Sequence, residues 1–144
     1  MTLPLGAILF ADDNEDDRFL MMTAAADAGI DNKIVAVADG DEAIAYLKTC
    51  PSGGTGCPQL AVLDYLMPRK TGLETLRWIR QDKRWMTLPV LILSASSMPT
   101  DERTAYLTGA NAFLTKPTSL DELGDLMKAL KAFWLELTAF RPSD

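Results

Sequence analysis

Five short apolar segments alternate with longer amphipathic segments along the chain. The apolar segments lie at 7–11, 33–37, 60–63, 89–93 and 112–114. In the most continuous of them, apolar residues follow one another without polar alternation, as expected for strands buried on both faces of a sheet. The pattern therefore predicts parallel strands that are covered by helices on both sides.

Helix signals occupy the intervals between these segments, at 15–28, 39–49, 71–82, 99–108 and 119–137. Three of the helices begin with a capping residue that is followed three positions later by Glu: Asp39 with Glu42, Thr71 with Glu74, and Ser119 with Glu122. Five strand–helix repeats with short links predict one α/β domain with a doubly wound, flavodoxin-like sheet of order 2-1-3-4-5. We expect this domain to occupy residues 1–137 and residues 138–144 to form a C-terminal tail.

Composition and charge exclude several classes of function. The 144 residues carry 14 basic and 20 acidic side chains, a net charge of −6, which argues against nucleic acid and anionic membranes as partners. The chain has no His, so His general bases, Ser-His-Asp triads and His-ligated zinc are excluded. No apolar run is long enough to span a bilayer, and the start of the chain lacks the basic residues of a secretory signal. A cytoplasmic location is expected.

Two cysteines, Cys50 and Cys57, flank a segment rich in Pro and Gly. Their spacing matches no redox or metal motif, which favours two reduced thiols over a disulfide-closed loop.

Polar side chains stand where the predicted strands end. Asp12 and Asp13 follow the first strand, Asp64 the third, Ser94 the fourth and Lys116 the fifth. Because the carboxyl ends of parallel strands meet at one edge, where such sheets bind ligands, we expect these five side chains to converge.

Three converging carboxylates repel one another unless a cation lies between them, and their oxygens suit Mg²⁺. One carboxylate can then attack a phosphoryl group to form an aspartyl phosphate, which the Lys116 ammonium and the Ser94 hydroxyl would stabilise. The cluster therefore predicts a site that accepts, holds and releases a phosphoryl group.

The ordered set of motifs resembles the receiver domain of two-component response regulators, with its CheY-like fold, over nearly the whole chain. The matching segments are 8–14, 39–43, 63–68, 72–74, 93–95 and 109–117. The resemblance implies that Asp64 is the phosphoacceptor and that Mg²⁺ is held directly by Asp13, through water by Asp12, and by the backbone carbonyl of Leu66.

The resemblance also assigns roles to the residues around the phosphoacceptor. Ser94 would move onto the phosphoryl group, Lys116 would pair with it, and Phe113 would be the aromatic switch residue. It implies a cis peptide bond between Lys116 and Pro117.

Within the family, the chain is most similar to the single-domain regulators associated with bacterial and cyanobacterial phytochromes. That similarity rests on residues 12–18, on the long loop before the third strand and on residues 133–137. It implies a sensor histidine kinase, such as one of the phytochrome type, or a phosphotransfer protein as the donor, and a downstream protein as the target. Apolar residues at the end of the last helix, Phe133, Trp134, Leu137 and Phe140, predict a homodimer contact, with a tail that folds back on its own domain as the alternative.

Three other interpretations fit the sequence less well. A flavodoxin needs a Ser/Thr/Gly-rich phosphate cradle after the first strand, where this chain is acidic. A Mg²⁺-dependent aspartyl-phosphate phosphatase carries a second Asp two residues after its nucleophile, whereas Asp12 is followed there by Asn14 and Asp64 by Leu66. A calcium loop starting at Asp12 lacks the Gly and the final Glu that it requires. A switch protein is therefore expected rather than a metabolic enzyme, with the phosphatase as the alternative.

Overall fold

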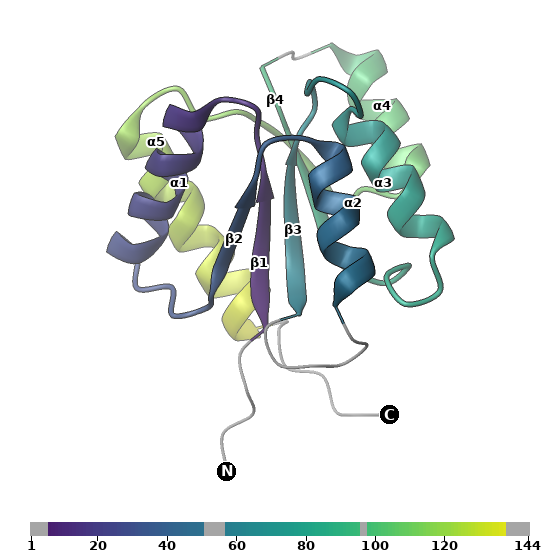
Figure 1. Ribbon diagram of the computed structural model, residues 1–144. Helices are drawn as coiled ribbons and strands as arrows, with labels where there is room; N and C mark the ends of the chain where they lie inside the picture. The colour runs from purple at the N-terminus through teal and green to yellow at the C-terminus, as the bar shows by residue number, and fades with distance from the viewer. Residues whose placement is uncertain (1–5, 51–56, 96–97, 138–144) are drawn as a thin grey trace.

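Five parallel strands form one sheet in the order β2-β1-β3-β4-β5, which confirms the predicted topology (Figure 1). The computed structural model describes residues 6–50, 57–95 and 98–137. The strands are β1 (Ala7–Ala11), β2 (Ile34–Val37), β3 (Pro58–Asp64), β4 (Val90–Ser94) and β5 (Ala112–Thr115). The α-helices are α1 (Glu15–Asp27), α2 (Gly40–Thr49), α3 (Gly72–Gln81), α4 (Pro99–Thr108) and α5 (Leu120–Ala129), and a π-helical segment (Leu130–Leu137) follows α5.

Helices cover both faces of the sheet, and each face has its own apolar core. α1 and α5 lie together on one face, and α2, α3 and α4 on the other (Figure 1). The three central strands are buried almost throughout, as their continuous apolar sequences predict. Because helices cover both faces of the sheet, side chains that bind ligands must lie at its edges.

The helix ends follow the predicted capping signals. The side chains of Asp39, Thr71 and Ser119 each accept a hydrogen bond from the backbone N–H three residues later. At the start of α3 the pairing is reciprocal, because Glu74 also accepts from the backbone N–H of Thr71. None of the described helices is both long enough and apolar enough to cross a membrane.

The last helix differs from the prediction of a regular α-helix to residue 137. From Leu130 onwards it is a π-helix, with hydrogen bonds to the fifth residue along the chain. Apolar residues spaced three and four apart are compatible with either helix type, so the sequence pattern did not distinguish them.

Two apolar side chains of this helix do not lie as helical spacing alone indicates. Leu120 lies three residues before the buried Leu123, but it is 59% exposed, because it occupies the first turn of α5. Trp134, which the sequence analysis placed in a homodimer contact, packs against the core under α1 and α5, whereas its neighbour Phe133 is 50% exposed. The side chains of Leu137 and Phe140 lie outside the described residues.

Cys50 and Cys57 are not joined in a disulfide, and both are buried in the core between the sheet and α2–α4. The segment between them lies outside the described residues.

Candidate functional site

Three carboxylates meet at the carboxyl edge of the sheet. Asp12 follows β1 and is fully buried, Asp64 ends β3 and is nearly buried, and Asp13 is exposed. One oxygen from each lies within 4.8 Å of the others. Strands that are adjacent in space, although far apart in sequence, bring these residues together, as the sequence analysis predicts.

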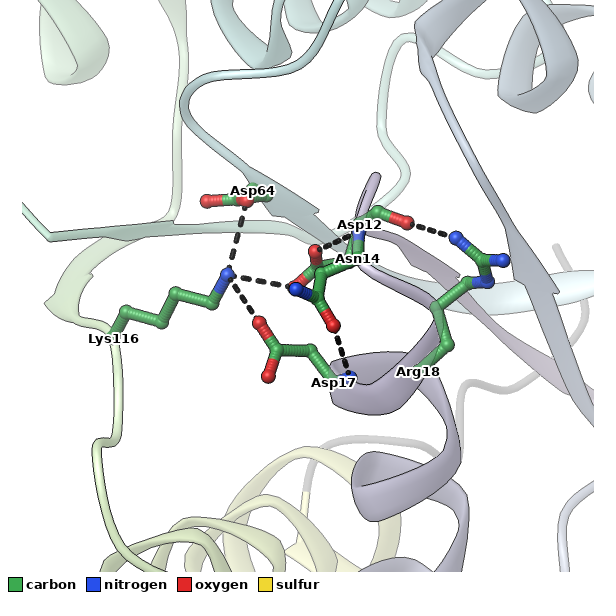
Figure 2. Close-up of polar contacts among 6 residues, drawn as sticks. All are labelled: Asp12, Asn14, Asp17, Arg18, Asp64 and Lys116. Atoms are coloured by element: carbon green, nitrogen blue, oxygen red, sulfur yellow. Dashed lines mark hydrogen bonds and ion pairs between the residues drawn. The ribbon is translucent and has the colours of Figure 1, made fainter.

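The ammonium group of Lys116 lies among carboxylates, as Figure 2 shows. Its Nζ is 2.9 Å from Asp12 Oδ2, 3.1 Å from Asp64 Oδ2 and 3.0 Å from Asp17 Oδ2. The first two contacts join the predicted site residues, and the third brings in a residue that the sequence analysis did not select.

Burial and charge shift the protonation equilibria of this group of side chains. Burial, together with the neighbouring Asp12 and Asp13 carboxylates, raises the pKa of Asp64 to about 6 against the lowering effect of Lys116. Burial by itself disfavours the ammonium form of Lys116, but hydrogen bonds to Asp12 and Asp17 and the charge of Asp64 leave its pKa raised. Lys116 is therefore a cation throughout the physiological range, and the carboxylates retain an excess of negative charge.

The corner between β1 and α1 holds two of these carboxylates in place. The backbone N–H of Asn14 donates to Asp12 Oδ1, and Asn14 Oδ1 accepts from the backbone N–H of Asp17, each at 2.9 Å (Figure 2). Arg18 donates from Nη1 to the backbone carbonyl of Asp12 at 2.7 Å. The N-terminal cap of α1 thus also orients the acidic side chains.

A glycine allows α3 to start directly beside Asp64. A Cβ on Gly72 would lie 2.3 Å from the carbonyl oxygen of Asp64, and the Gly72 N–H donates to the carbonyl of Tyr65. Any larger residue would push α3 away from the end of β3.

The loop after β3 is tied to the start of α2 by a pair that the sequence analysis did not find. Arg69 donates from Nε to the buried Asp39 carboxylate at 2.9 Å, with a second contact from Nη2. The backbone N–H of Glu42 and the Arg69 guanidinium lower the pKa of Asp39, against the effect of burial. Asp39 was recognised only as a helix cap, since nothing in its spacing indicates a partner in the β3–α3 loop.

The remaining predicted site residues lie around the cluster. Ser94 is buried at the end of β4, next to β3, and the backbone N–H of Lys116 donates to its carbonyl at 2.8 Å. Leu66 lies two residues after Asp64 with its side chain 68% exposed. The described residues contain no cis peptide bond, so the bond between Lys116 and Pro117 is trans and the cis expectation was wrong. The cis and trans isomers of a peptide bond before proline differ little in free energy, so the resemblance to the family was not sufficient to predict the isomer in this chain.

Phe113 packs in a cluster that joins the site to α4. Its ring meets that of Tyr65 edge to face at 5.9 Å, and Tyr65 follows Asp64 directly. The Tyr65 hydroxyl donates to Asp101 of α4 at 3.2 Å, and the Tyr106 hydroxyl accepts from the backbone N–H of Phe113. Phe113 is 9% exposed and so occupies the inward position.

Asp17 lies in the first turn of α1, three residues after the N-cap Asn14, at the end of the helix that starts beside β1. The sequence analysis noted the acidic run but assigned roles only to the residues at the strand end.

The arrangement fits a hard divalent cation. Three carboxylate oxygens from two strand ends lie close enough together to bind one ion. Asp64 is buried, so its negative charge is unfavourable unless a cation lies beside it. The chemistry of the donors is thus that of a Mg²⁺ or Mn²⁺ site beside a nucleophilic carboxylate and an ammonium.

The family model described as "Response regulator receiver domain" matches residues 8–128. Response regulator Rcp1 of Synechocystis is 30% identical over 134 residues, which cover 92% of this chain and 91% of Rcp1. The crystal structure of the Mn²⁺-bound form of Rcp1 superposes with a TM-score of 0.81 at 29% identity, over 95% of this chain and 99% of that one.

Two further solved structures are similar over almost their whole length. The phosphorylated cyanobacterial phytochrome response regulator RcpA has a TM-score of 0.84 and 34% identity, covering 96% of this chain and 99% of that one. Response regulator RPA3017, from red light signaling of R. palustris, has a TM-score of 0.83 and 30% identity, covering 99% of this chain and 100% of that one. In sequence and structure this chain is thus close to phytochrome-associated response regulators.

Proposed function

The chain belongs to the response regulator receiver domain family, and on that premise we propose that it is a single-domain switch whose Asp64 accepts a phosphoryl group. One observation carries this proposal. Asp64 ends β3 within 3.1 Å of the Lys116 ammonium, and one of its oxygens lies within 4.8 Å of oxygens of Asp12 and Asp13.

In the proposed reaction, an Asp64 carboxylate oxygen attacks the phosphorus of a phosphohistidine on the donor. The new P–O bond forms as the P–N bond breaks, and the leaving imidazole keeps the electron pair and takes up a proton. Lys116 donates a hydrogen bond to a phosphoryl oxygen, and we assign Ser94 the same task from the end of β4. These donors stabilise the charge that the transferred group carries.

Asp12, Asp13 and Asp64, together with the backbone carbonyl of Leu66, would hold Mg²⁺. When bound, the ion supplies positive charge to the phosphoryl oxygens and offsets the repulsion among the carboxylates. The relative Rcp1 has been crystallised with Mn²⁺, which supports a divalent ion at this kind of site.

The test separates a switch from the phosphatase alternative. After incubation with acetyl phosphate and Mg²⁺, intact-mass measurement should show one added phosphoryl group, whereas generic phosphomonoesters should not be turned over. Continuous multiple turnover of phosphomonoesters without accumulation of phosphorylated protein would favour the phosphatase.

We propose that phosphorylation is read at α4 and β5 through Tyr65 and Phe113. Tyr65 follows Asp64 directly. Its ring contacts Phe113 of β5 and its hydroxyl donates to Asp101 of α4, so movement at Asp64 reaches β5 and α4 through one direct contact each. Amide exchange should therefore change at 98–104 and 112–114 on phosphorylation, and Tyr65→Phe should reduce the change in α4. Exchange that changes only in the loops around Asp64 would contradict this route.

We infer that the phosphoryl donor is a histidine kinase or a phosphotransfer protein, and that the signal passes on by contact with a downstream protein. The similarity to RcpA and RPA3017 supports a kinase of the phytochrome type. The cytoplasmic location expected from the sequence stays a prediction.

We propose that residues 133 onwards, with α5 and the tail 138–144, form a homodimer contact. Phe133 is half-exposed and meets the ring of Trp134 edge to face at 5.1 Å, which places a rigid aromatic pair at the end of the helix. Sedimentation at micromolar concentration should show a dimer that Phe133→Lys converts to monomer. As a control, Phe19→Lys changes an exposed side chain of α1 and should leave the dimer intact. A parent protein that is monomeric with and without phosphorylation would contradict the contact.

A further inference from the structure

Lys116 has a third acidic partner, Asp17, that does not belong to the carboxylate cluster. We propose that Asp17 is a positioning residue of the phosphorylation site, which anchors the Lys116 ammonium so that one of its N–H groups faces the phosphoryl group on Asp64. This inference rests on the proposed phosphorylation of Asp64 and adds a residue that sets its rate.

Three carboxylate oxygens surround the ammonium group. Lys116 Nζ lies 2.9 to 3.1 Å from oxygens of Asp12, Asp17 and Asp64, and its contact with Asp64 is a hydrogen bond. Asp17 is therefore as close a partner as Asp12 and Asp64. The Lys116 side chain is 20% exposed and that of Asp17 38%, so the pair is partly shielded from solvent.

Of the three partners, only Asp17 has no second task during the reaction. Asp12 and Asp64 belong to the cluster that would hold the cation, and Asp17 does not. Phosphorylation converts the Asp64 carboxylate into an acyl phosphate, which removes the charge that held Lys116 and replaces it with phosphoryl oxygens. Asp17 remains a full carboxylate before and after transfer and so can hold the ammonium in place while its other partners change.

Asp17 is itself held in place. It lies in the first turn of α1, and its backbone N–H donates to Asn14 Oδ1, while the backbone N–H of Asn14 donates to Asp12 (Figure 2). Its side chain is short and starts from a capped helix end, whereas the lysine side chain is long and flexible. Asp17 therefore restrains Lys116, and loss of Asp17 would let the ammonium turn towards Asp12 or solvent.

The test compares two charge-neutralising variants in the same helical turn. Asp17→Asn should slow labelling by acetyl phosphate at saturating Mg²⁺ about two- to fivefold, the upper part of the range expected for one partly exposed charged contact. Asp16→Asn removes the same charge from an exposed neighbour and should change the rate less than about twofold. Asp17→Glu restores a carboxylate and should recover most of the lost rate.

A double-mutant cycle shows whether the effect passes through the ammonium. In a Lys116→Met background, Asp17→Asn should have no further effect on the rate. A similar slowing in both backgrounds, or faster labelling in Asp17→Asn because a repulsive charge is lost, would overturn the inference. Thermal unfolding compares Asp17→Asn with Asp16→Asn, and if Asp17→Asn does not fold, Asp17→Ser takes its place in the same cycle.

Failure of this inference differs from failure of the proposed function. If the parent is labelled on Asp64 but the Asp17 and Asp16 variants behave alike, only the role of Asp17 is wrong. If the parent takes up no phosphoryl group at all, or Asp64→Asn is still labelled, the proposed function itself is wrong.

Discussion

Replacing Asp64 with Asn should abolish phosphorylation completely. The amide is close in shape to the carboxylate but lacks the anionic oxygen that attacks phosphorus, so no acyl phosphate can form. Intact-mass measurement after incubation with acetyl phosphate and Mg²⁺ should show one phosphoryl group on the parent and none on the variant.

A matched control is available in α2. Asp41 is exposed and its carboxylate lies 3.9 Å from the Lys70 ammonium, outside the carboxylate cluster, so Asp41→Asn should be labelled like the parent. Undiminished labelling of Asp64→Asn would place the phosphoacceptor elsewhere, and the buried Asp12 would be the next residue to test.

Mg²⁺ should stabilise the protein strongly, and increasingly so as the pH rises through about 6. The pKa of Asp64 is raised from its ordinary value of 3.8 to about 6, so the metal-free fold favours the protonated form. The resulting stabilisation is fully present below pH 3.8 and is lost as the pH rises to about 6, a change on the order of 3 kcal/mol in the free energy of unfolding. Above that pH the carboxylate is ionised and ready to bind the cation.

Urea unfolding of the parent and of Asp64→Asn, each without metal, isolates this group from the other carboxylates. The free energy of unfolding of the parent should fall relative to that of the variant between pH 4 and pH 6. At pH 8, Mg²⁺ at one hundred times its Kd should raise the free energy of unfolding of the parent by about 2.7 kcal/mol. A parent and variant with parallel pH profiles would contradict the raised pKa.

The metal response should depend on Asp13. Asp13→Asn should weaken Mg²⁺ binding by about tenfold or more, measured by calorimetry, because a direct ligand matters at least as much as a residue that only orients one. Asp16→Asn, a neighbouring exposed carboxylate outside the cluster, should bind Mg²⁺ like the parent. Equal affinities of the parent and Asp13→Asn would remove Asp13 from the ligand set.

The order of the strands and the convergence of Asp12, Asp13, Asp64, Ser94 and Lys116 could be predicted from the sequence. The reason is physical: continuous apolar runs must be buried on both faces, right-handed crossovers leave few topologies, and in a parallel sheet the carboxyl ends of the strands share one edge. The edge residues could therefore be identified without any knowledge of their side-chain contacts.

Only the tertiary structure decided how side chains from distant elements pair. The contact of Asp17 with Lys116, the ion pair of Arg69 with Asp39, and the burial that raises the pKa of Asp64 all depend on distances of a few ångströms between separate elements. The period of a helix indicates which residues share a face, but not which face meets a partner or where the helix passes the edge of the sheet. For the same reason helical spacing did not determine that Leu120 is exposed and that Trp134 packs against the core.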